Sequence, residues 1–146
     1  MGWTLVDPRY YAEQLRRNGA ALGDGATPLW YQDDTLTGAG ELVLWMDRQR
    51  RVVGFELSHT GWPHGKEHVA EWSPATGLRM GEVESGDAPA GLRRDASSLV
   101  RRLHAPNPAI LRDMLRYFDS HSGLLDPAHR QAISGVLHEA ASSATP

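Results

Sequence analysis

The fold is decided by one stretch, residues 41–58, which reads ELVLWMDRQRRVVGFELS. Two largely apolar runs, residues 41–46 and 51–58, flank the polar connection 47–50. A short polar connection between two such runs is typical of a β-hairpin. We therefore predict two antiparallel strands joined by a turn at residues 47–50.

The two predicted strands differ in their patterns. In the second strand, Val53, Phe55 and Leu57 recur at every other position, which places them on one face of a sheet. The first strand is apolar throughout residues 42–46 and does not alternate. A continuously apolar strand is typical of one that is covered on both faces. We therefore predict that the first strand is central in the sheet.

Further strands extend outward from this hairpin. Residues 29–32, 68–72 and 78–84 are strand-like, and Pro74 and Gly77 supply turn chemistry between the last two. Together these segments predict an antiparallel sheet of about five strands within residues 28–85.

The segments outside the sheet region are predicted to be helical. Asp7 as a cap and Gly19 as a stop predict a helix over residues 7–19. Residues 88–141 predict about three C-terminal helices, of which the first carries an apolar stripe over residues 92–103. Strands followed by helices indicate an α+β fold, and a length of 146 residues indicates one domain spanning residues 1–146.

Composition excludes several classes of protein. The chain has no cysteine, which excludes disulfides, thiolate metal sites and cysteine nucleophiles. A formal net charge of −3 and the lack of a recognised motif argue against a nucleic-acid partner. The longest apolar run is far shorter than a membrane span, and the first residues do not resemble a signal peptide. We therefore expect a cytoplasmic protein that has no membrane partner.

Histidines are concentrated between residues 59 and 71. His59, His64 and His68, with Glu71, offer the imidazole and carboxylate groups that bind zinc and similar ions. The spacing of His64 and His68 suits a helix, but the proline and glycine beside His64 indicate a loop. The favoured interpretation is a hairpin loop with solvated histidines, and a metal site made of these four residues is the alternative.

Arginines and one loop tryptophan are the candidate partner-binding residues. Three arginines cluster at the tip of the predicted 47–50 hairpin, and two more share a face of the predicted 92–103 helix. A tryptophan in the glycine- and proline-containing loop 61–65 is the remaining candidate, because Trp and Arg are enriched where proteins bind one another. The set is Trp62, Arg48, Arg50, Arg51, Arg94 and Arg101.

The sequence favours a non-catalytic function. It contains no nucleophile elbow, no dinucleotide or phosphate-binding glycine motif and no sound metal motif, so we expect no cofactor. The first hypothesis is a protein-binding or adaptor module that acts through its sheet edge, the 61–65 loop and its arginines. The alternative is a metal-dependent hydrolase or metal-binding protein. A small-molecule pocket between sheet and helices is left open as a third possibility.

Overall fold

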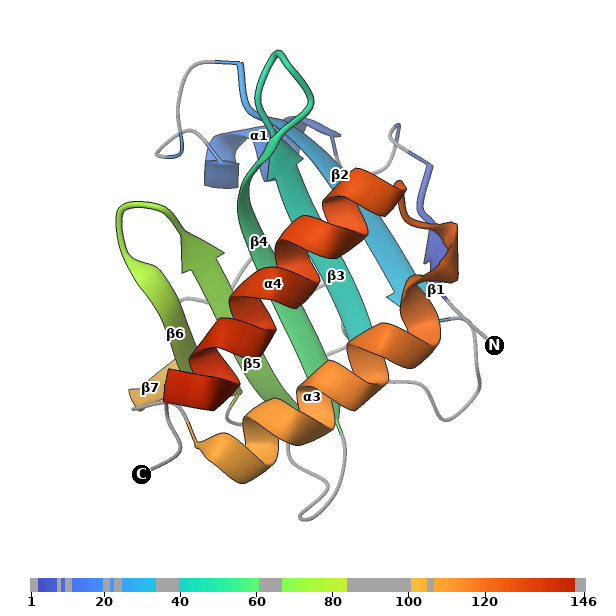
Figure 1. Ribbon diagram of the computed structural model, residues 1–146. Helices are drawn as coiled ribbons and strands as arrows, with labels where there is room; N and C mark the ends of the chain where they lie inside the picture. The colour runs from blue at the N-terminus through green and yellow to red at the C-terminus, as the bar shows by residue number, and fades with distance from the viewer. Residues whose placement is uncertain are drawn as a thin grey trace.

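A computed structural model describes residues 3–7, 9, 12–19, 22, 25–33, 40–60, 67–83, 101–104 and 107–143. Its centre is a seven-stranded sheet in which every strand is antiparallel to its neighbours. The order of the strands in the sheet follows their order in the chain, so the sheet is a meander (Figure 1). The predicted α+β class is confirmed.

All five predicted strands are present, and they form the middle of this sheet. They are β2 (Thr27–Asp33), β3 (Gly40–Met46), β4 (Val52–Thr60), β5 (Glu67–Ser73) and β6 (Gly77–Val83). Two short strands that were not predicted extend it at either edge. They are β1 (Trp3–Leu5) and β7 (Arg101–His104). The predicted count of about five strands was therefore too low.

The strand β7 corrects the prediction of a helix over residues 92–103. Arg101–His104 pairs with β6, with Leu103 opposite Gly81. The rest of that predicted helix lies outside the described residues. Pairing satisfies backbone N–H and C=O groups along the β6 edge, and this long-range gain outweighs a local helical pattern in a segment this short.

Two helices follow β7. They are α3 (Pro108–His121) and α4 (Pro127–Ser143), linked by the short 3₁₀ helix η3 (Ser122–Leu124). Side chains cap the start of both helices: the Asn107 side chain accepts the N–H groups of Ala109 and Ile110, and Asp126 accepts that of Ala128. No helix in the described part of the chain has the length and apolar character needed to cross a membrane.

The N-terminal helix is shorter than predicted. It is α1 (Ala12–Gly19), which ends at the predicted glycine but begins after the predicted start at residue 7. The Asp7 carboxylate accepts the backbone N–H of Arg9 at 2.9 Å and also binds the Arg9 guanidinium at 2.7 Å. Among the described residues, the bonds of Asp7 are to Arg9, which precedes α1.

The sheet is covered on both faces. In Figure 1, α3 and α4 lie side by side across the near face, and α1 lies behind the sheet near its upper end. On the far face, Leu15 of α1 packs with Trp30, Val43 and Trp45. Every residue of β3 is buried, as predicted for a central strand. The larger core lies between the near face and the two C-terminal helices, and its fully buried side chains include Leu42, Leu44, Phe55, Leu57, Met80, Leu111, Met114, Phe118, Ile133 and Leu137.

Candidate functional site

The β3–β4 turn carries three of the arginines predicted to bind a partner. Asp47 organises the turn, because its Oδ1 accepts the backbone N–H groups of Gln49 and Arg51, each at 2.9 Å. The Asp47 carbonyl also accepts the N–H of Arg50 at 3.0 Å. The hydrogen bond from the Arg51 N–H is the main cause that lowers the pKa of Asp47. The turn therefore retains a carboxylate at neutral pH, and its backbone is fixed by that group.

Arg51 belongs to the internal bonding of this turn. Its Nε lies 3.0 Å from Asp47 Oδ2, and its guanidinium donates to Gln49 Oε1 at 3.0 Å. The side chain is exposed, so this ion pair contributes little to stability by itself. Its guanidinium already faces groups within the turn.

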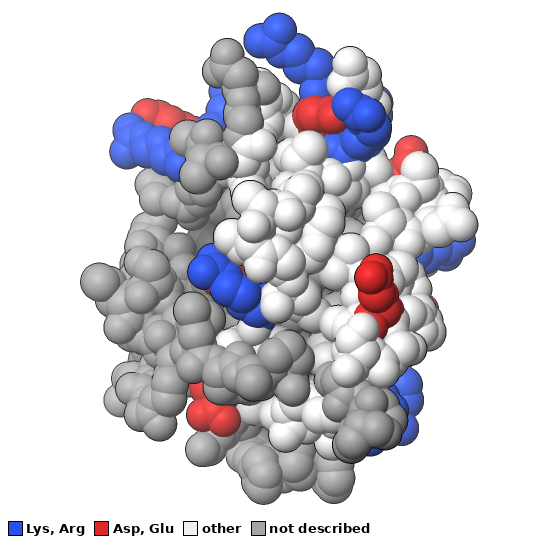
Figure 2. All heavy atoms as spheres, turned by 60° about the vertical axis from the view of Figure 1, so that its left-hand side comes forward, with Lys and Arg blue, Asp and Glu red and all other residues white. Residues whose placement is uncertain are grey.

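Arg48 and Arg50 are the two arginines at this tip that are exposed and form no ion pair within the described part of the chain. The Arg48 side chain lies beside Gly25, and a Cβ at that glycine would sit 2.9 Å from Arg48 Nε. In Figure 2, Lys and Arg side chains protrude at the upper end of the molecule, where the β3–β4 turn lies in Figure 1.

The backbone of Arg50 is unusual. Its φ of 64° lies in the left-handed region, and Arg50 is the one described residue other than glycine with a positive φ. Its carbonyl accepts a hydrogen bond from Nε2 of His129, at 2.9 Å. Since His129 is buried in α4, this bond connects the tip of the turn to the helix layer.

The other three predicted partner-binding residues have no side chain in the described part of the structure. Arg101 lies in β7, at an edge of the sheet, and its side chain is outside the described part. Trp62 and Arg94 also lie outside it. Their part in binding stays a prediction.

The three predicted metal ligands that the structure describes lie on two faces of the sheet. His59 and His68 are cross-strand partners in β4 and β5. Glu71 is three positions from His68 and therefore points to the opposite face, where it lies 3.3 Å from the Arg79 guanidinium. Glu71 is thus separated from the two histidines by the sheet. His64 lies outside the described residues, and within them no three His, Asp or Glu side chains form a group that could hold a metal.

His59 instead joins a cluster of polar and aromatic side chains under α3. Its ring stacks on Tyr117, with ring centroids 3.9 Å apart, and its Nδ1 lies 3.6 Å from Asp113 Oδ2. His121 packs on the other side of the cluster, 4.2 Å from the Tyr117 ring and 3.3 Å from the Asp33 carboxylate. Burial is the main cause that lowers the pKa of His59, and the Asp113 carboxylate opposes it.

Tyr117 is the centre of this cluster. Its hydroxyl donates to Asp33 at 3.1 Å and accepts the indole N–H of Trp3 at 3.1 Å. Gly40 makes room for that hydroxyl, because a Cβ at this position would collide with it. Burial raises the pKa of Tyr117 far above its usual value. These hydrogen bonds connect β1, β2 and α3 and hold the three elements together.

The sequence analysis did not identify this cluster. Asp113, Tyr117 and His121 are spaced four residues apart, which places them on one face of a helix, and that spacing is visible in the sequence. Nothing local connects them with Asp33 or Trp3, since the sheet brings those residues together from distant positions.

Comparison of the chain with protein-family models, with curated proteins and with solved structures found no match.

Proposed function

We propose that this protein is a non-catalytic module that binds another protein. In this proposal the β3–β4 turn presents Arg48 and Arg50 to an acidic surface of the partner. The observation that carries the proposal is the left-handed backbone of Arg50, with a φ of 64°, at an exposed tip.

The left-handed backbone of Arg50 lowers the stability of the chain, and no ion pair of its side chain with a described residue offsets this loss. A residue with a Cβ loses about 1–2 kcal/mol in the left-handed region, whereas glycine adopts it freely. The Arg50 guanidinium forms no ion pair with a described residue that would offset this cost. Strained backbone of this kind gathers at binding and catalytic sites. This supports a role for the Arg50 side chain outside the folded chain itself.

The turn is also ordered before any partner arrives. Asp47 holds its backbone through two N–H groups, and His129 holds the Arg50 carbonyl from α4. A pre-ordered loop loses less entropy on binding. A guanidinium matches a carboxylate in a planar, two-pronged geometry, so two arginines that form no ion pair with a described residue favour an acidic partner.

The test compares three purified forms of the full chain: the natural sequence, the double variant Arg48→Glu/Arg50→Glu, and Arg112→Ala. Arg112 is exposed on α3, a helix that lies away from the β3–β4 turn in Figure 1, and serves as a control. Proteins captured from the source cell by each form are identified by mass spectrometry. The affinity of each candidate is then measured by calorimetry with purified components.

A true partner is retained by the natural chain and by Arg112→Ala, and its affinity for the double variant is lower by about tenfold or more. Its affinity also falls as salt concentration rises, since exposed charges are screened. If every candidate binds the double variant as tightly as the natural chain, the proposal is wrong.

A further inference from the structure

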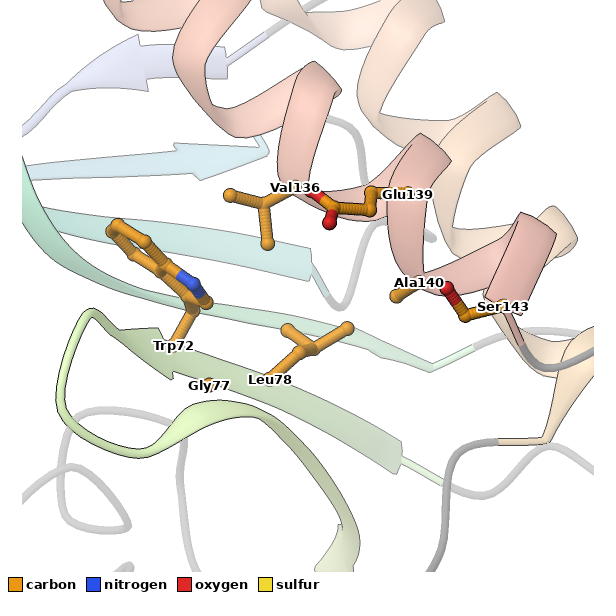
Figure 3. A pocket seen from close by; sticks show the side chains of 7 residues that line it. All are labelled: Trp72, Gly77, Leu78, Val136, Glu139, Ala140 and Ser143. Carbon is orange, nitrogen blue, oxygen red and sulfur yellow. The ribbon is translucent and has the colours of Figure 1, made fainter.

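A cavity of about 560 Å³ lies between the β5–β6 hairpin and the C-terminal half of α4. The β5–β6 hairpin lies towards the β7 edge of the sheet and is separated from β3 by β4 (Figure 1). Figure 3 shows side chains approaching it from both layers. They belong to Trp72, Gly77, Leu78, Val136, Glu139, Ala140 and Ser143.

The walls of this cavity are apolar. Trp72 and Leu78 are cross-strand partners, and Val136 and Ala140 face them from α4. Trp72 is partly exposed and stacks on Phe55, with ring centroids 5.8 Å apart, which fixes the orientation of the indole. Pockets that bind small organic molecules enclose about 300–1,000 Å³ with mostly apolar walls, so this cavity has a suitable size and lining.

Three features at the cavity favour a positively charged ligand. Glu139 is exposed and forms no ion pair with any residue that the structure describes. The cavity also lies at the C-terminal end of α4, a helix of 17 residues with no basic residue in its last turn. The C-terminal end of a helix carries a partial negative charge, and an indole attracts cations to its face. The Glu139 carboxylate, the C-terminal end of α4 and the Trp72 indole therefore all favour a positively charged ligand.

We propose that this cavity binds a small organic cation: a molecule with one ammonium group on an aromatic or aliphatic body. The body would occupy the space between Trp72 and Val136, and the ammonium group would lie near Glu139. This site is independent of the proposed protein-binding turn.

The test uses three probes that share one apolar body and differ in charge: 4-phenylbutylamine, 4-phenylbutanol and 4-phenylbutyrate. Binding of each to the full chain is titrated by ligand-observed NMR at neutral pH. The amine is expected to bind about tenfold more tightly than the carboxylate, with the alcohol between them. Equal binding of amine and carboxylate, or no binding of the amine at millimolar concentration, would overturn the proposal.

Two variants locate the site. Glu139→Gln is expected to weaken binding of the amine about fivefold and to leave binding of the alcohol unchanged, because the substitution removes one charge and keeps the shape of the side chain. Ser143→Trp places a large ring at the edge of the cavity and is expected to weaken all three probes. Glu13→Gln makes the same charge change on α1, which packs against the other face of the sheet, and is the control. If Glu13→Gln weakens the amine as much as Glu139→Gln does, the amine responds to net charge and the proposal fails.

Discussion

His59 shows how one residue can have a different role from the one its sequence neighbours suggest. It lies in a histidine-rich stretch, yet its ring stacks on Tyr117 and its nearest carboxylate is Asp113, both from α3. Burial makes the charged form of this ring less favourable in the folded state, and the neighbouring His121 and His68 add to that effect. Asp113 and Asp33 oppose it without cancelling it.

The lowered pKa of His59 has a defined consequence for stability. An unfolded histidine has a pKa of about 6.5, so below that pH the unfolded chain binds the proton more readily than the folded chain does. The contribution of His59 is therefore complete above about pH 6.5, and it is lost as the pH falls through the lower pKa of the folded state. We predict that His59→Gln reduces the loss of unfolding free energy between neutral and mildly acidic pH.

Urea unfolding of the natural chain and of the variant at several pH values measures this effect. His138→Gln, at an exposed position of α4, is the matched control. The explanation would be contradicted if the His59 and His138 variants changed the pH dependence by the same amount.

Individual site residues were only partly predictable from the sequence. The arginines of residues 47–51 could be placed at a hairpin tip because a short polar connection between two strands has few other structures. The sequence could not tell that the Arg51 guanidinium binds Asp47 and Gln49, whereas the guanidinium groups of Arg48 and Arg50 do not. It also could not separate His59 from Glu71, because their placement depends on the register of β4 and β5.

Among the elements, the β3–β4 turn is the one in which local stability and the proposed function conflict. Arg50 occupies a left-handed position, which glycine adopts without steric cost. Glycine has its own cost, since it loses more backbone entropy on folding, of about 0.5–1 kcal/mol. We predict that Arg50→Gly stabilises the chain by about 0.5–1 kcal/mol and weakens partner binding.

Thermal and urea unfolding measure the stability change. Arg48→Gly removes an equally large exposed side chain from the same turn, but at a residue without a positive φ. It is therefore expected to leave the stability unchanged or to lower it. If both variants changed the stability equally, relief of backbone strain would not be the cause.

Elements that depend on local pattern were located well, and elements that depend on distant pairing were not. One predicted face was wrong: a register shift between β3 and β4 places Val53 on the α1 face, whereas Phe55 and Leu57 lie on the face of the C-terminal helices. The strands β2 to β6 alternate or are continuously apolar, and α3 and α4 begin at asparagine or aspartate followed by proline. The strands β1 and β7 have three and four residues, too few to show a period. Each exists because it adds hydrogen bonds to an edge of the sheet that the rest of the chain has already formed.

For the whole molecule, the central fact is that the strand β3 is covered on both faces of the sheet. Each residue of β3 is buried, and β2 and β4 flank it within the sheet. Opening β3 requires separation from the helix layer on one face and from α1 on the other. The proposed partner site and the proposed cation site both lie outside this centre, so ligands can bind there without disturbing it.

This arrangement predicts the order in which backbone amides exchange with solvent. Amides of β3 are expected to exchange only when the whole chain unfolds, whereas those of the three-residue edge strand β1 exchange through local opening. Hydrogen–deuterium exchange followed by NMR measures both. The free energy obtained from the slowest β3 amides should equal that from urea unfolding. Slower exchange in α4 than in β3 would contradict the prediction, because it would show that the sheet opens while the helices stay folded.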